Sequence, residues 1–91
     1  MDARQLIKKY QAGERDFRGV DFSGSNLYSV NLSGSNLYRA IFKNAQLQDV
    51  DLSNCNLTEA NFNGANLTGA NLSGSNANWV QMIEANLNGA L

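Results

Sequence analysis

Residues 60–74 read ANFNGANLTGANLSG, three consecutive five-residue units that share one pattern: a small residue, Asn, Leu or Phe, and then two residues that are polar or glycine. The same phase extends in both directions, so that every fifth residue from Phe17 to Leu87 is apolar. A period of five matches neither the 3.6-residue period of an α-helix nor the two-residue period of a flat strand. The repeat therefore indicates a solenoid.

Two positions of the unit are expected to point inward. One is the large Leu or Phe, and the other is the small residue two places before it, as in Val50, Cys55 and Ala60. The Asn or Asp between them faces outward, where its short side chain can accept a hydrogen bond from nearby backbone and favour a turn. Seven of the eight glycines follow the large position by two residues, which is a natural corner. We therefore expect the chain to turn every five residues around a narrow apolar core.

A second period sets the cross-section. Phe22, Phe42 and Phe62 recur at intervals of twenty, and Met82 continues the series. Four units then make one coil with a square outline, and the aromatic rings form a stacked core ladder on one inner wall. Fifteen units correspond to just under four coils.

The segments AlaAsnPheAsnGly at 60–64, AlaAsnLeuThrGly at 65–69 and AlaAsnLeuSerGly at 70–74 resemble the pentapeptide-repeat family, whose consensus is A(D/N)LXX. The resemblance covers residues 16–91. It implies an all-β solenoid, the right-handed quadrilateral β-helix, and the handedness comes from the resemblance alone. Short members with a helix and a GlyGluArgAspPhe segment, here at 13–17, are frequent in cyanobacteria.

The N-terminal segment predicts a helix over Ala3–Ala12, with Asp2 as its N-cap and Gly13 as its stop. We expect its apolar stripe to cover the open end of the first coil, because a solenoid end needs protection. The predicted organisation is one domain, with a capping helix at 1–13 and the β-helix at 14–91. The covering residues are Ala3, Leu6, Ile7 and Tyr10.

The repeat loosens before Leu91. Ala77 is small for a large position, whereas Trp79 and Ile83 are apolar at outward positions. Two interpretations follow. Either Trp79 folds over the space left by Ala77, or Trp79, Ile83 and Leu91 form an association surface, for a second copy or for continuation into a longer protein.

No residue pattern points to catalysis. Histidine is absent, which removes Ser–His and Cys–His nucleophiles and His-containing metal sites. Cys55 occupies an inward position, and the pair Asp49 and Asp51 has no accompanying cleft. The glycines follow the repeat rather than a phosphate-binding loop. We expect no catalytic, cofactor-binding or metal-binding residues, and no enzyme.

The charge is nearly balanced, at −1 overall, which disfavours nucleic acid and membrane surfaces as partners. All seven basic residues lie at or before Lys43. No apolar stretch reaches the roughly 20 residues of a membrane helix, and the start has no signal-peptide core. One cysteine fits a reducing compartment. We expect a cytoplasmic protein or the processed form of an exported one.

Outward residues twenty apart should be neighbours in adjacent coils. Arg39 is then expected to pair with Glu59, and Arg18 to lie beside Tyr38 in a cation–π contact. Tyr28 and Tyr38 fall on opposite walls, so they are separate candidate interaction positions rather than one aromatic patch.

These features favour a non-catalytic structural or protein-interaction module whose partner is a protein, with self-association through the C-terminal coil as one form. An alternative from another branch of the family is a DNA-mimicking protein that binds DNA gyrase, but that role needs a long acidic rod and this chain is short and almost neutral. A further alternative is an accessory repeat domain of a larger protein.

Overall fold

The computed structural model describes all 91 residues. Its one regular element is helix α1 (Ala3–Gln11). Asp2 is the N-cap, and a capping box holds the first turn: the Asp2 carboxylate accepts the Gln5 N–H at 2.8 Å, and the Gln5 side chain accepts the Asp2 N–H at 3.1 Å. Gly13 follows with a φ of 97°. The helix begins where the sequence predicts and ends one residue earlier.

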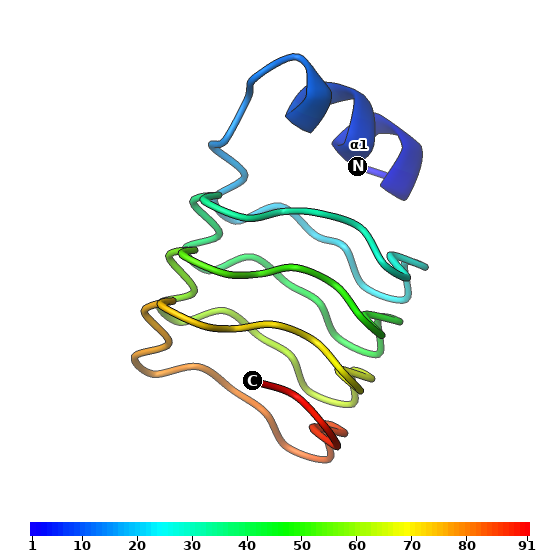
Figure 1. The fold of residues 1–91 in the computed structure, drawn as a ribbon, viewed down its shortest axis with the longest axis vertical. Coiled ribbons are helices and arrows are strands. Elements are labelled where there is room, and N and C mark those ends of the chain that lie inside the picture. The colour runs from blue at the N-terminus through cyan, green and yellow to red at the C-terminus, as the bar shows by residue number, and fades with distance from the viewer.

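From Asp16 onward the chain winds into stacked rungs joined by parallel bridges (Figure 1). Each bridge pairs residues twenty apart, from Asp16 with Asn36 to Asn66 with Asn86. This register agrees with four units per coil. The backbone hydrogen bonds follow it, as in Leu27 N–H to Gln46 O at 2.8 Å.

The predicted solenoid forms with little continuous β-strand, because residues of adjacent coils pair singly in parallel bridges. A turn interrupts the chain in every unit, for example where the Val30 N–H donates to Leu27 O at 3.1 Å. Each wall therefore contributes a single bridging residue per coil. Pairing continues along the stack rather than along the chain.

The turns depend on two local devices. The outward Asn or Asp accepts the N–H two residues later, as Asn31 does from Ser33 at 2.9 Å, which confirms the role predicted for this position. The residue two places after each large position has positive φ. Glycine occupies seven of these positions, while the rest include Ser29 (59°) and Trp79 (60°).

The core is the predicted ladder of large and small residues. Phe22 and Phe42 stack with ring centroids 5.2 Å apart, and Phe42 and Phe62 stack at 4.9 Å. All three rings are fully buried, whereas Met82 is half-buried at the end of the column. The stacking confirms the twenty-residue coil.

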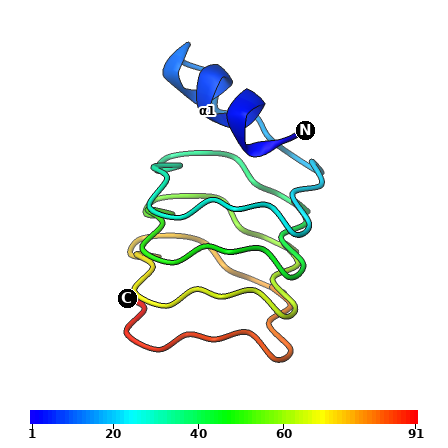
Figure 2. The same ribbon diagram turned by 90° about the vertical axis from the view of Figure 1, so that its right-hand side faces the viewer.

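Helix α1 lies across the first coil (Figures 1 and 2). Its Leu6 is completely buried and belongs to the core, and Ala3 and Tyr10 pack against that core while partly exposed. The Tyr10 hydroxyl donates to the Ser33 carbonyl at 2.8 Å. Ile7 is half-buried.

Candidate interaction surface

The last coil is the part of the stack with the thinnest core. Leu67, one coil earlier, is fully buried, but Leu87 below it is 42% exposed. Ala77 is exposed and Met82 only half-buried. The large position at 77 carries a methyl group, so the column it belongs to ends early. The apolar interior is therefore open at this edge.

The same edge presents backbone donors without acceptors. In the preceding coil the Leu57 N–H donates to Asn76 O at 2.7 Å, and the Phe62 N–H donates to Gln81 O at 2.8 Å. The equivalent groups of the last coil make no such bond in the structure. The unpaired N–H groups along this edge belong to Gly74, Ala77, Trp79, Met82, Glu84, Leu87 and Gly89. Such a row is a template for pairing with another chain.

Three large apolar side chains surround this edge. Trp79 is 85% exposed, Ile83 70% and Leu91 75%. Trp79 occupies the turn position with φ of 60°, which directs its side chain away from the core. The interpretation in which Trp79 folds over the space left by Ala77 is therefore wrong.

The turn that carries Ile83 is held from the coil above. Gln81 replaces the usual Asn, so the local hydrogen bond to residue 83 is missing. Instead, the Asn63 side chain accepts the Ile83 N–H at 2.9 Å and donates to Gln81 Oε1 at 3.2 Å. Ile83 is consequently exposed on an anchored turn. The repeat pattern gave no signal for this contact.

The tyrosines stand apart from the edge and from each other. Tyr28 is 60% exposed and Tyr38 is half-buried. Tyr38 lies in a shallow depression of roughly 400 Å³ with Arg18, Gly19 and Arg39. Tyr28 lies on the wall opposite Trp79, and Tyr38 lies on the same wall as Trp79 but two coils above it, so neither tyrosine is part of this edge.

The charges around Tyr38 differ in part from the prediction. Arg39 pairs with Glu59 at 3.3 Å, as expected. Arg18 instead makes two hydrogen bonds to Asp16, at 2.8 and 2.9 Å, and Arg39 is the cation near the Tyr38 ring, 5.2 Å from its centroid. A bidentate ion pair within one turn outcompetes the weaker contact between coils.

These ion pairs perturb their carboxylates. The hydrogen bond from Arg18 lowers the pKa of Asp16. The Tyr38 hydroxyl, followed by Arg39, lowers the pKa of Glu59. Both cations of the depression are thus neutralised by partners within the chain, and the depression offers no free positive charge to an anion.

Reactive side chains are not gathered into a catalytic arrangement. Cys55 is buried, its thiol donates to the Leu32 carbonyl at 3.1 Å, and burial raises the pKa of that thiol. The chain has no group of three His, Cys, Asp or Glu residues placed to hold a metal ion. No helix is long and apolar enough to cross a membrane.

Comparison with known proteins gives one family and several related structures. The model of pentapeptide repeats matches residues 16–54 and 45–89, with eight copies. Comparison with curated proteins gives no match.

HetL from the cyanobacterium Nostoc sp. strain PCC 7120, a pentapeptide repeat protein involved in heterocyst differentiation regulation, is 27% identical over 93% of this chain, with a TM-score of 0.92. Rfr23 from the cyanobacterium Cyanothece 51142 is 35% identical over 82% of this chain, and alr5209 from Nostoc PCC 7120 is 33% identical over 98%, each with a TM-score of 0.68.

This chain spans 36% of HetL, 58% of Rfr23 and 74% of alr5209. The likeness supports the right-handed quadrilateral β-helix that the repeats imply, and proteins of this kind are generally not enzymes. With the twenty-residue register, the stacked phenylalanines and the family match in agreement, the chain belongs to the pentapeptide repeat family.

Proposed function

We propose that this chain is a non-catalytic protein-interaction module that binds its partner at the C-terminal edge. One observation carries the proposal: Trp79 is 85% exposed beside a row of unpaired backbone N–H groups. Tryptophan is enriched at binding hot spots because one side chain combines a large apolar area with little conformational entropy to lose. Exposed Ile83 and Leu91 extend the same apolar area.

The walls of the solenoid are weaker candidates than its edge. Their outward Asn and Asp side chains already bond to backbone within each turn, as Asn66 does to the Thr68 N–H at 3.0 Å. Two ion pairs on these walls, Arg18 with Asp16 and Arg39 with Glu59, are also formed within the chain. The stacked coils therefore act chiefly as a rigid support for the edge that carries Trp79.

The partner we propose is a protein that offers an apolar surface and backbone carbonyls, which would continue the ladder by strand addition. A second copy satisfies both requirements, since its own edge is apolar and also carries free carbonyls. The molecule measures 23 and 20 Å across its shorter axes, so an edge-only contact is smaller than the roughly 800 Å² per partner of a standard interface. We expect self-pairing to be weak and a different protein that also covers Trp79 to bind more tightly.

A role through binding, rather than through catalysis, is also consistent with the similarity to HetL, which is involved in regulation.

The test compares an edge variant with a wall variant. The edge variant is Trp79→Ala with Ile83→Ala, and the matched control is Tyr28→Ala with Tyr38→Ala, which also removes two large side chains. Sedimentation velocity over a wide concentration range measures self-pairing, and affinity capture from the source organism measures other partners.

We expect the edge variant to lose the dimer or the captured protein while the wall variant retains it. Equal binding by both variants would contradict the edge as the docking surface. Loss with the wall variant alone would move the site to the tyrosines.

A further inference from the structure

Helix α1 lies over the first coil but leaves a groove above Asn31, where it does not replace the hydrogen bonds that a further coil would make. One coil below, the Asp51 N–H donates to Val30 O at 3.0 Å, and Asp51 O accepts the Leu32 N–H at 2.8 Å. The corresponding N–H and C=O of Asn31 face α1 and have no partner. The next carbonyl, that of Ser33, is satisfied by the Tyr10 hydroxyl. The helix backbone is committed to its own hydrogen bonds, so Asn31 keeps both a donor and an acceptor free.

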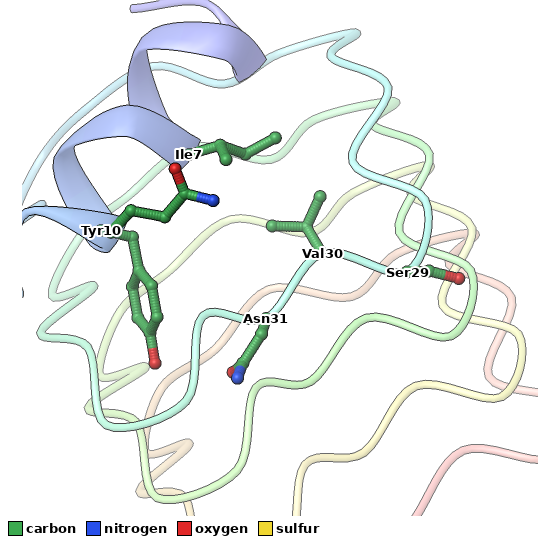
Figure 3. A pocket seen from close by; sticks show the side chains of 6 residues that line it. Ile7, Tyr10, Ser29, Val30 and Asn31 are labelled. Carbon is green, nitrogen blue, oxygen red and sulfur yellow. The ribbon is translucent and has the colours of Figure 1, made fainter.

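A groove opens at this point. It lies between α1 and the turn at Ser29, with a volume of roughly 450 Å³, within the range of ligand sites. In Figure 3, Val30 points from the coil toward α1, and Ile7 reaches over from the helix. Val30 and Ile7 are both half-buried. The groove thus combines an apolar lining with one residue, Asn31, whose backbone N–H and C=O are both unpaired. Its lining residues are Ile7, Tyr10, Gln11, Ser29, Val30 and Asn31.

The helix side of the groove carries unpaired positive charge. Arg4, Lys8 and Gln11 are spaced i, i+4 and i+7, so they form one stripe along the helix, and Gln11 lines the groove. Arg4 and Lys8 are exposed and make no ion pair, whereas Lys9 on the next stripe pairs with Glu14 at 3.6 Å. The field at this rim therefore favours carboxylates.

We propose that this groove binds an extended acidic segment of another protein, which adds to the first coil as a short parallel strand at Asn31. The segment's carbonyl accepts the Asn31 N–H, and its N–H two residues later donates to Asn31 O, as in the ladder below. Alternate apolar side chains pack on Val30 and Ile7. The intervening and flanking acidic side chains face outward, with those nearest the helix meeting Arg4 and Lys8. This site lies at the opposite end of the solenoid from the Trp79 edge.

The probe is a fluorescein-labelled peptide of sequence EVEVE, measured by fluorescence anisotropy with the full chain. Its first valine lies over Val30, and the N–H of its second valine is the donor to Asn31 O. Two peptides serve as controls: KVKVK reverses the charge, and EVEVE with an N-methylated second valine removes that donor. We expect each control peptide to bind at least about tenfold more weakly than EVEVE.

Matched protein variants separate this groove from the other edge. Arg4→Glu with Lys8→Glu should weaken EVEVE binding by about tenfold or more, whereas Lys9→Glu with Lys43→Glu, which changes the net charge equally, should change it by less than about twofold. Hydrogen exchange adds a site-specific readout, because bound EVEVE should slow exchange of the Asn31 amide.

Four outcomes would overturn the proposal: no saturable EVEVE binding up to about 1 mM, equal binding of KVKVK, equal weakening by the two double variants, or binding without protection of Asn31. The peptide comparisons and the exchange measurement use the unmodified chain, so they decide the question even if a variant fails to fold.

Discussion

The two ends of the solenoid differ in how far their apolar core and their unpaired backbone groups are covered. At the N-terminal end, α1 adds Leu6, completely buried, to the core and supplies the Tyr10 hydroxyl to a carbonyl of the first coil. At the C-terminal end, Leu87 is 42% exposed and the N–H groups of the last coil have no acceptor. Within residues 1–91, one end is covered by α1 and the other presents an exposed edge.

The contrast shows what a repeat cannot encode. Each coil is stabilised by packing and hydrogen bonds with the coil above and the coil below. The first and last coils of a regular repeat therefore lack these contacts on one side. A segment outside the repeat, such as α1, or a partner must complete an end. The irregular residues, Trp79 and Ile83 among them, lie in the coil that no other coil of residues 1–91 covers.

The largest effect should separate the middle of the stack from its open end. Phe42→Ala removes a ring packed between Phe22 and Phe62, and we expect it to lower the free energy of unfolding by about 3–5 kcal/mol. Met82→Ala, in the same column but half-buried, should cost only about 1 kcal/mol. Urea unfolding followed by circular dichroism measures both. Equal losses would mean that the last coil is as well packed as the middle.

The next comparison tests the covered end against the open one with the same substitution. Leu6→Ala should destabilise the protein by about 2–3 kcal/mol, because a fully buried side chain leaves a cavity between α1 and the first coil. Leu87→Ala removes a side chain that is already 42% exposed, and its cost should stay below about 1 kcal/mol. Thermal unfolding of the two variants checks the order. A larger loss for Leu87→Ala would contradict the description of the two ends.

The features that the sequence predicted are those repeated at fixed spacing. The phenylalanine column, the turn-forming Asn and Asp, and the pairing of Arg39 with Glu59 all follow from the period of five and the coil of twenty. The bounds of α1 follow from a cap and an apolar stripe. In each case the determining contacts are local or are placed by a simple register.

The features that the sequence missed depend on competition or on tertiary placement. Glycine occupies only seven of the fifteen turn positions of the repeat, so the period places Trp79 outward but no residue signal marks its left-handed backbone. Arg18 could contact either Asp16 or the ring of Tyr38, and only the structure shows that it binds Asp16. The groove beside Asn31 exists because a helix lies on a β edge, and no periodic pattern reports that.

A smaller effect should come from the hydrogen bond at the covered end. Tyr10→Phe removes the donor to Ser33 O and should lower the free energy of unfolding by about 1 kcal/mol, since the ring still packs on the core. Tyr28→Phe is the matched control, because Tyr28 is 60% exposed and its hydroxyl makes no hydrogen bond. Denaturant titration of both variants gives the difference. A change as small as that of the control would show that the helix is held by apolar contacts alone.

At the open end, one substitution should stabilise the protein. The left-handed backbone of Trp79 is strained, and its exposed side chain gains no burial that would offset this strain. Trp79→Gly should therefore raise the free energy of unfolding by about 0.5–1 kcal/mol. Ser29→Gly, at the same position of a five-residue unit in the first coil, should give a similar gain. If Trp79→Gly were destabilising, the indole would have a structural role, and its exposure would no longer support a role in binding.

The smallest effect concerns Glu59, which lies one coil above Trp79. Its folded pKa is lowered from the ordinary 4.5, first by the Tyr38 hydroxyl and then by Arg39. A lowered folded pKa means that the carboxylate contributes stability above pH 4.5 and loses that contribution as the pH falls through the lower folded value. Glu59→Gln should therefore reduce the melting temperature slightly at pH 7 and leave it nearly unchanged at strongly acidic pH, where the wild-type carboxylate is also neutral.

Glu84→Gln controls for the loss of one negative charge, since Glu84 makes no ion pair and lies on the open coil. Melting temperatures measured across the acid range for both variants should differ only for Glu59→Gln. Because Glu59 and Arg39 are exposed, the difference is expected to be small and to shrink with added salt. A pH-independent loss would instead assign the effect of Glu59→Gln to the turn, where residue 59 has a positive φ.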